Sequence, residues 1–269
     1  MSGKLYLVAT PIGNLGDITL RALDVLKCAD VVACEDTRRT LGLLTHFEIK
    51  KPLISYYKGK EREGAEKILS ILSEGKNVAV VSDAGMPGIS DPGIYLVREA
   101  MLQGVPYTVI PGACAFVTAT ALAGVEQPYT FIGFLPEKKK DRDNLLEEYK
   151  NSSAKLIFYC APHDLNETLK YLAEAFGKRD VYLVKEITKM YEGVTMGVLG
   201  VDYVDNPKGE YVIIVCGKEK VITEASDEEI KAELTHLISQ GIDKKQAISD
   251  TAKKYDISKN TVYKLSIDL

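Results

Sequence analysis

The sequence has few of the side chains that usually bind transition metals or form disulfides. Its three histidines, His46, His163 and His236, lie far apart in the 269-residue chain and form no H-E-x-x-H motif. Because zinc sites need clustered ligands, we expect no metal. The five cysteines are odd in number and contain no C-x-x-C pair. This pattern does not indicate a disulfide framework and favours a reducing environment such as the cytoplasm.

The chain also lacks long apolar segments and a strong excess of one charge. The apolar run CAFVTATALAGV (114–125) is well short of the roughly 20 residues that a membrane span needs. The N-terminus, MSGKLYLVATP, has no charged region followed by a long apolar stretch, so no signal peptide is predicted. The net charge of -4 argues against a uniformly basic nucleic-acid binder, although it does not bear on local basic patches. We expect a soluble, cytoplasmic protein.

Three familiar enzyme motifs are missing as well. No G-x-x-x-x-G-K-[ST] occurs, which argues against a P-loop nucleotide hydrolase. No G-x-G-x-x-G follows the first predicted strand, and no G-x-S-x-G is present. The standard dinucleotide fingerprint and the nucleophile elbow of the hydrolases are therefore excluded.

Strands and helices are predicted to alternate in the first half of the chain. Short apolar, β-branched runs predict strands at 5–10, 30–34, 77–81 and 107–112. Helical periodicity predicts helices at 17–29, 61–75, 93–104 and 114–124, the first of them capped by Asp17. This order is typical of an α/β domain with a mostly parallel sheet and crossover helices.

A break in this alternation, QPYTFIGFLPEKKKDRD (127–143), predicts a second domain. Strands at 155–160, 180–188 and 211–216 and a helix at 164–177 follow it. Beyond these, we expect a helix at 226–241, with Ser226 and Glu229 forming a capping box, and a helix–turn–helix at 243–265. Six lysines and two aspartates between Lys244 and Lys264 give this part a local charge of +4. We divide the chain into an N-terminal α/β domain (1–124), a second α/β domain (125–222) and a helical, helix-turn-helix-like tail (223–269).

Three glycine-rich loops follow predicted strands: TPIGNLGD (10–17), SDAGMPGISDPG (82–93) and PGACAF (111–116). In an open α/β sheet, ligands bind in the crevice beyond the carboxyl ends of the strands. Glycines allow the backbone to approach a ligand closely, and Asp83 and Asp91 add carboxylates. Any one of these loops alone is more often a plain structural turn. Taken together, the three loops predict a ligand pocket at one edge of the sheet.

The segment EDTRRT (35–40) has two interpretations, and the residues alone leave both open. In the first, Glu35 and Asp36 begin a helix and favour its dipole, while Arg38 and Arg39 are solvated. In the second, the carboxylates accept a proton and the arginines hold phosphate. Cys34, Cys114 and Cys160 are expected to be small packed residues. His163, after Pro162, is either a loop residue or part of a site.

Five segments, in order along the chain, resemble one family: TPIGNLGDITLRAL, CEDTRRT, SDAGMPGISDPG, PGACA and GFLP. They resemble the tetrapyrrole (corrin/porphyrin) methylase superfamily, and within it a branch that methylates ribosomal RNA. The resemblance implies two α/β domains with a cleft between them that holds S-adenosylmethionine, and a homodimer. It also implies transfer of a methyl group to the ribose 2′-hydroxyl of a cytidine in the 16S rRNA of the small ribosomal subunit.

A ribose hydroxyl is a weak acid, so a general base would help the transfer, and Glu35 and Asp36 are the candidates, with Asp83 as the next choice. The residues around the cofactor are what the resemblance implies. The cofactor would be lined by Pro11, Ser82, Asp83, Ala84, Gly85, Met86, Pro87, Asp91, Pro111, Gly112, Ala113, Cys114, Phe116, Tyr159, Cys160 and Tyr211. RNA would be bound by Asn14, Arg38, Arg39, Lys244, Lys245, Lys253, Lys254 and Lys259, with a strong dependence on salt.

The chain departs from the family pattern at three places. Met86 stands where the family usually has threonine, Cys160 and Asp164 replace a glutamate and an arginine, and PGAC replaces Pro-Gly-Pro followed by a small residue. These changes bear on RNA positioning more than on cofactor binding. Two alternatives remain: a methylase of a small tetrapyrrole-like molecule, and a cofactor-sensing regulator that binds nucleic acid. The tail either grips RNA or packs as a helical bundle on the dimer.

Overall fold

The computed structural model describes residues 2–218, 226–255 and 257–267. The chain forms two compact units, 1–218 and 219–269. The expected boundary between residues 222 and 223 lies outside the described residues. Within the described ranges, no helix has both the length and the apolar character to cross a membrane.

The first sheet is parallel throughout, which confirms the expected alternation of strands and helices. Its five strands lie in the order β3-β2-β4-β1-β5. Their bounds are β1 (Leu5–Val8), β2 (Val31–Cys34), β3 (Leu53–Ser55), β4 (Val78–Val81) and β5 (Tyr107–Ile110). The short strand β3 was not predicted, because three residues after Pro52 carry too little periodicity to identify a strand.

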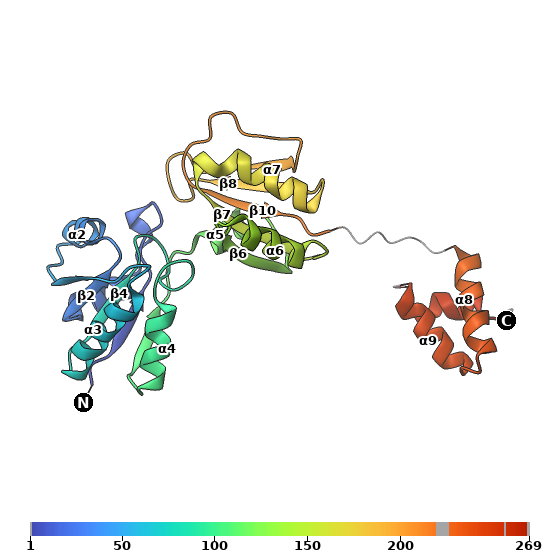
Figure 1. The fold of residues 1–269 in the computed structure, drawn as a ribbon, viewed down its shortest axis with the longest axis horizontal. Helices are drawn as coiled ribbons and strands as arrows, with labels where there is room; N and C mark the ends of the chain where they lie inside the picture. Colours follow the sequence, from blue (N-terminus) through green and yellow to red (C-terminus); the bar gives the residue numbers. More distant parts are fainter. Residues whose placement is uncertain (1, 219–225, 256, 268–269) are drawn as a thin grey trace. The chain divides into compact units, whose positions relative to one another are not determined.

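Helices cover both faces of this sheet. Side chains alternate along a strand, so Leu5 and Leu7 of β1 pack on α3 (Glu61–Ser73) and α4 (Ile94–Leu102), while Val8 packs on the opposite side. Figure 1 shows α3 and α4 running across the sheet. The opposite face is covered by α1 (Leu20–Cys28) and α2 (Thr37–His46).

The predicted start of α1 is wrong. Thr19 caps the helix, because its hydroxyl oxygen accepts a hydrogen bond from the Ala22 N–H at 3.1 Å. Asp17 belongs instead to the short 3₁₀ turn Leu15–Asp17, whose cap is Asn14. Asp17 and Thr19 are both acceptable N-cap residues, and only the path of the backbone decides which of them caps the helix.

The second sheet is mixed, with strand order β6-β7-β10-β8-β9. Only β6 and β7 pair in parallel; the other neighbours are antiparallel. The strands are β6 (Tyr129–Phe134), β7 (Lys155–Cys160), β8 (Asp180–Lys185), β9 (Gly193–Val198) and β10 (Tyr211–Val215). Helices α6 (Lys139–Tyr149) and α7 (Leu165–Phe176) cover one face. Strands β6 and β9 and helix α6 were not predicted: glycines interrupt the two strands, and α6 lies in a charge run.

Helix α5 (Ala115–Leu122) packs on the second sheet rather than the first, although the sequence places it in the first half of the chain. Its fully buried Ala119 lies in a cluster with Ile157 of β7 and with Val212 and Ile214 of β10. The apolar run at 114–125, which is too short to span a membrane, therefore contains the helix that covers the remaining face of the second sheet. It also brings the PGACAF loop to the place where the two sheets meet.

The second unit contains the expected helices, α8 (Asp227–Ser239), α9 (Lys244–Lys254) and α10 (Lys259–Leu265). The predicted capping box is confirmed: Ser226 accepts from the Glu229 N–H at 3.2 Å, and the Glu229 carboxylate accepts from the Ser226 N–H at 2.9 Å. Ile230, Leu234 and Val262 contribute to a small core of its own.

We predict that Ala119→Leu destabilises the protein by about 1–3 kcal/mol, because the added methylenes must be forced between α5 and the second sheet. Urea unfolding would measure the change. Ala121→Leu is the matched control, since Ala121 is exposed on the same helix. Equal stabilities for the two variants would contradict the packing of α5 on the second sheet.

Candidate active site

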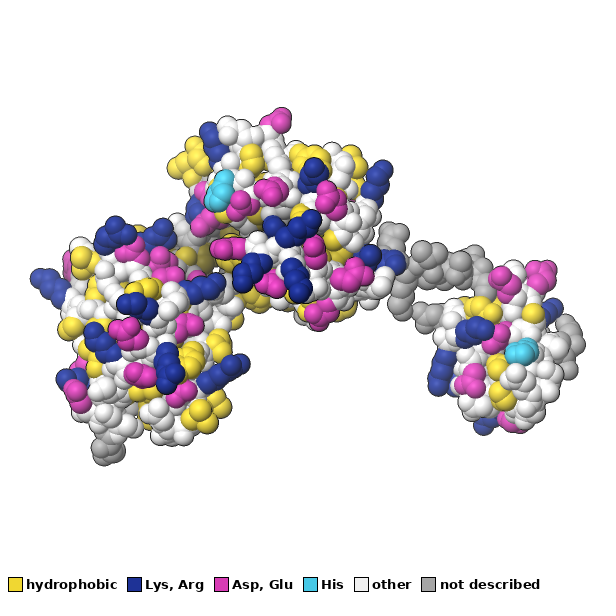
Figure 2. All heavy atoms as spheres, in the orientation of Figure 1, with side chains coloured by type: hydrophobic (Ala, Val, Ile, Leu, Met, Phe, Trp, Pro, Cys, Tyr) yellow, Lys and Arg dark blue, Asp and Glu magenta, His cyan; other side chains and the backbone are white. Residues whose placement is uncertain are grey.

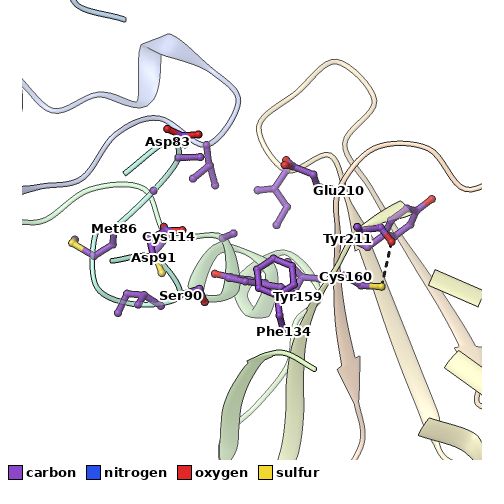
Figure 3. A pocket seen from close by; sticks show the side chains of 18 of the residues that line it. Asp83, Met86, Ser90, Asp91, Cys114, Phe134, Tyr159, Cys160, Glu210 and Tyr211 are labelled. Atoms are coloured by element: carbon purple, nitrogen blue, oxygen red, sulfur yellow. Dashed lines mark hydrogen bonds between the residues drawn. The ribbon is translucent and has the colours of Figure 1, made fainter. Parts of the chain in front are cut away.

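A pocket of about 440 Å³ lies where the glycine-rich loops of the first sheet face strands β7 and β10 of the second. In Figure 3, Asp83, Met86, Ser90, Asp91 and Cys114 lie on one side, and Phe134, Tyr159, Cys160, Glu210 and Tyr211 lie on the other. All three loops contribute to it, through Ile12, Asp83 to Met86, and Cys114. The loops therefore meet at the carboxyl edge of the sheet, as the sequence predicts.

The wall formed by 82–93 is held by backbone contacts. Thr10 and Gly85 exchange two hydrogen bonds, of 2.9 Å and 3.1 Å, which tie the loop after β4 to the loop after β1. The φ angle of Gly85 is +82°, and a Cβ there would lie 3.2 Å from Ile12 Cγ2. Ser82 is buried, and its hydroxyl lies 3.2 Å from the Gly85 carbonyl oxygen that it can donate to. The positive φ angle favours glycine at position 85, and a side chain there would also crowd Ile12.

The pocket is lined by four carboxylates, Glu35, Asp83, Asp91 and Glu210. Burial raises the pKa of Glu35 above its ordinary value, and the negative charges of Asp91 and Asp83 raise it further. Burial likewise raises the pKa of Asp91, and the charge of Asp83 adds to the effect. A cationic ligand would relieve this repulsion, so the electrostatics favour a positively charged occupant.

Asp36 does not line the pocket. It is the N-cap of α2, where its carboxylate accepts from the Arg38 N–H at 2.8 Å and from the Arg38 guanidinium at 2.8 Å. Hydrogen bonds from the Arg38 side chain and backbone hold the pKa of Asp36 well below its usual range. The helix-start interpretation of EDTRRT therefore holds for Asp36, while Glu35 and Arg39 reach the pocket.

Asp83 is fixed from two directions. Its Oδ1 accepts from the Asp36 N–H at 3.0 Å, and its Oδ2 lies 3.3 Å from a guanidinium nitrogen of Arg39. These contacts join the loop after β4 to the first turn of α2. The carboxylate direction is thus set before any ligand binds.

The opposite wall is aromatic. Tyr159 lines the pocket, and its phenol oxygen accepts from the Phe116 N–H at the start of α5 at 3.1 Å. Burial raises the pKa of Tyr159 to about 12, so the phenol stays neutral. Phe116 stacks on Phe131 with ring centroids 4.3 Å apart, and Phe131 meets Tyr159 edge-on at 5.0 Å. Phe116 supports this wall from behind.

The structure brings together only part of the predicted cofactor set. The pocket is lined by Asp83, Ala84, Gly85, Met86, Asp91, Cys114, Tyr159, Cys160 and Tyr211. Pro87, Pro111, Gly112, Ala113 and Phe116 do not line it, and Pro11 and Ser82 line a neighbouring cavity. All three predicted loops reach the pocket, and which of their residues contact a cofactor stays a prediction. Cys160 is also a packed core residue, as expected of a buried cysteine.

The pocket also has lining residues that were not predicted, among them Phe134 and Val212 in strands of the second sheet and Ile187 and Glu210 next to its strands. Ile187 lies between Glu186 and Thr188, which both have positive φ angles, of 48° and 66°. Lys189 holds this bend, because its ammonium lies 2.9 Å from the carboxylates of both Glu186 and Glu210. The clustered charges of KEITKMYE (185–192) were a signal, but nothing in the sequence reveals which of them face a pocket.

The predicted RNA-binding residues lie in both units. Asn14, Arg38 and Arg39 belong to the first, with the Arg38 side chain 90% and that of Arg39 69% exposed. In the second unit, Lys244 donates to the Ser266 carbonyl at 2.7 Å and Lys254 pairs with Glu233 at 2.6 Å. The other predicted lysines, Lys245, Lys253 and Lys259, are exposed. Figure 2 shows basic side chains mixed with acidic ones on both units.

Comparisons with known proteins agree with this geometry. A family model described as Tetrapyrrole (Corrin/Porphyrin) Methylases matches residues 4–201. The chain is 41% identical to "Ribosomal RNA small subunit methyltransferase I" of Bacillus subtilis over 97% of this chain and 93% of that protein. It is 40% identical to the protein of the same name from Pasteurella multocida, over 100% of this chain and 98% of that protein.

Solved structures show the same fold at low sequence identity. The methyltransferase CobJ is 18% identical, with a TM-score of 0.63, over 82% of this chain and 97% of that one. Uroporphyrin III C-methyl transferase from Thermus thermophilus is 18% identical, with a TM-score of 0.59, over 80% of this chain and 98% of that one. At this identity the likeness concerns the fold.

We predict that Asp91→Asn stabilises the protein at neutral pH and weakens binding of a cationic cofactor. Because the folded pKa of Asp91 is raised above its unfolded value of about 3.9, the folded state holds the proton more tightly. Stability due to this group is therefore full at low pH and falls as the pH rises through the folded pKa. Thermal unfolding should show a larger gain for the variant at about pH 7.5 than at about pH 4.5.

Asp205→Asn is the control, since Asp205 is exposed in a loop outside the pocket. It should change stability little at either pH. An equal effect of Asp91→Asn at both pH values would contradict the assignment of a buried, repelled carboxylate.

Proposed function

Since the chain belongs to the tetrapyrrole (corrin/porphyrin) methylase family, and within it to the ribosomal RNA small subunit methyltransferase I proteins, we propose that it methylates RNA of the small ribosomal subunit with S-adenosylmethionine as donor. We further propose that the acceptor is the ribose 2′-hydroxyl of a cytidine in 16S rRNA. The observation that carries the proposal is 40% identity along the whole chain.

The residues of the pocket fit the donor. Its volume of about 440 Å³ lies in the range of small-molecule sites. The carboxylates of Asp83, Asp91 and Glu210 complement a ligand that carries ammonium and sulfonium charges. Ile12, Ile89 and Phe134 provide apolar surface for a base. Met86, where the family usually has threonine, leaves this acidic and apolar character intact.

When bound, S-adenosylmethionine supplies a methyl group activated by the positive charge on its sulfur. The protein has to hold the acceptor oxygen in line and exclude water, and such positioning supplies on the order of 7–11 kcal/mol. A ribose hydroxyl is a weak acid, so a general base adds roughly 10²–10⁴-fold. Glu35 is the first candidate, because it lines the pocket and its pKa is raised. Asp83 follows; Asp36 is held by Arg38.

We predict that Glu35→Gln lowers kcat by about 10²-fold or more, and that it also weakens donor binding somewhat because one negative charge of the pocket is lost. Wild-type kcat should fall on the acid side as Glu35 is protonated, and its raised pKa places that fall at a higher pH than for an exposed glutamate. The variant should lack this limb of the pH profile. Asp36→Ala is the comparison, because losing the α2 cap should lower stability instead. An unchanged acid limb in Glu35→Gln would exclude Glu35 as the base.

The basic tail is proposed as a second RNA contact. Its exposed lysines and its helix–turn–helix arrangement support this proposal. Phosphate contacts release counterions, so RNA affinity should fall steeply with salt. The rival proposal, a bundle that packs on a dimer, predicts no change in salt dependence when Lys245, Lys253 and Lys259 are replaced by glutamine.

The homodimer also remains a proposal. Strand β5 lies at the edge of the first sheet, with Tyr107 38% and Val109 45% exposed. An exposed apolar edge strand is a liability unless it is covered. We predict that Val109→Glu shifts the sedimenting mass from two chains to one, whereas Val201→Glu in an exposed loop does not. A wild-type mass of one chain would contradict the dimer.

The function is tested by incubating the protein with methyl-labelled S-adenosylmethionine and small subunits that lack the endogenous modification. Nucleoside mass spectrometry should find the label on a cytidine 2′-oxygen. Donor binding without labelled RNA would overturn the ribosomal substrate. Label on a tetrapyrrole, or sequence-specific DNA binding without transfer, would support one of the alternatives instead.

A further inference from the structure

A second cavity, of about 280 Å³, lies beside the donor pocket. It is formed by the loop after β1, the first turns of α2 and the end of β4. Its lining residues are Thr10, Pro11, Gly13, Leu15, Arg39, Thr40, Gly42, Leu43, Ser82 and Asp83. The family match explains these loops as cofactor walls, yet this cavity is separate from the pocket that the donor fits.

The two cavities share Arg39 and Asp83 and no other lining residue. These two side chains form an ion pair, with 3.3 Å between a guanidinium nitrogen and Oδ2. The Asp36 N–H holds the other carboxylate oxygen of Asp83 at 3.0 Å. The Arg39–Asp83 ion pair therefore lies between the donor pocket and the second cavity. A group bound in the second cavity is separated from the donor pocket only by these two side chains.

The lining has the chemistry of a nucleotide site. Pro11, Leu15 and Leu43 present apolar surface, which suits the faces of a nucleobase. Arg39 lines the cavity and Arg38 lies on the same turn of α2, and both side chains are largely exposed. Arginines of this kind pair with phosphate. A volume of about 280 Å³ suits one nucleoside and is far too small for a helical stem.

Gly42 lines the cavity from an exposed position on α2. It lies inside α2, where glycine is unfavourable compared with alanine. Its φ angle is not positive, so the backbone does not require glycine here. A Cβ at this position would meet nothing within 4 Å. A larger side chain at this position therefore has room to extend over the cavity without a clash at its Cβ.

We propose that this second cavity seats one unpaired nucleotide of RNA, with its ribose directed at the Arg39–Asp83 pair and thus at the donor pocket. RNA-modifying and RNA-reading proteins commonly take single bases out of the stack, and this cavity provides the place for one. The inference rests on the proposed function, since it names the seat of the acceptor in the same reaction. It makes Gly42 a specificity-determining residue.

The test is Gly42→Leu, which fills the open space. We expect kcat/KM for small subunits to fall at least about 10-fold, the cost of 1.4 kcal/mol in transition-state binding. Donor affinity, measured by calorimetry, should be unchanged, and the melting temperature should be equal or higher because leucine favours a helix. Thr45→Leu is the matched control, since Thr45 is exposed on α2 and does not line the cavity. Wild-type kcat/KM in Gly42→Leu would overturn the proposal, and so would an equal loss of donor affinity.

A second measurement separates this inference from the proposed function. Cytidine 5′-monophosphate, titrated to millimolar concentration and followed by ligand-observed NMR, should bind the wild type and Thr45→Leu but not Gly42→Leu. If the wild type methylates no ribosomal RNA yet shows this pattern, the cavity stands and the ribosomal substrate falls. If the wild type methylates RNA while neither Gly42→Leu nor the nucleotide shows an effect, the cavity assignment falls alone.

Discussion

The pair of backbone hydrogen bonds between Thr10 and Gly85 is the constraint on which the site depends. It joins the ends of two neighbouring parallel strands just beyond the sheet, where no further ladder exists to hold them. The loop after β4 is therefore a wall with a fixed position, and Asp83 leaves it in a fixed direction toward α2. A flexible loop would have to be ordered on binding, and that cost would be subtracted from the affinity.

The same architecture has an electrostatic cost. Burial raises the pKa values of Glu35 and Asp91, and the negative charges held around the same pocket raise them further, so the empty site opposes its own charge. Such a site is expected where function rather than stability selects the residues. The surrounding structure supports this arrangement with large apolar clusters on both faces of each sheet. The negative charge of the pocket thus favours a cationic ligand, and the apolar core that holds these carboxylates in place does not depend on their charge.

Local sequence signals predicted the fold where one strand or helix carries its own pattern. The buried strand β4 and the capping box of Ser226 and Glu229 are of this kind. Strand β9, with its exposed side chains and two glycines, has no such signal and is formed by pairing with β8. The site also follows this distinction between local and non-local signals. The loops after predicted strands were identified from the sequence. Glu210 was not, because its place at the pocket depends on the ion pair with Lys189 and on the positive-φ bend at Glu186 and Thr188.

Cys160 and Asp164, where the chain departs from the family pattern, differ in how they lie relative to the pocket. Cys160 pairs in register with Tyr211, the neighbour of Glu210, so a carboxylate remains at this end of β10 although the one on β7 is missing. The Cys160 thiol is buried, with the Ala161 carbonyl oxygen at 3.3 Å and the Thr168 hydroxyl at 3.6 Å, and it adds no carboxylate charge here. Asp164 lies at the surface, 3.2 Å from His163. Glu210 therefore keeps a carboxylate at this end of the pocket, whereas the change at residue 164 falls at the exposed surface, outside the pocket lining.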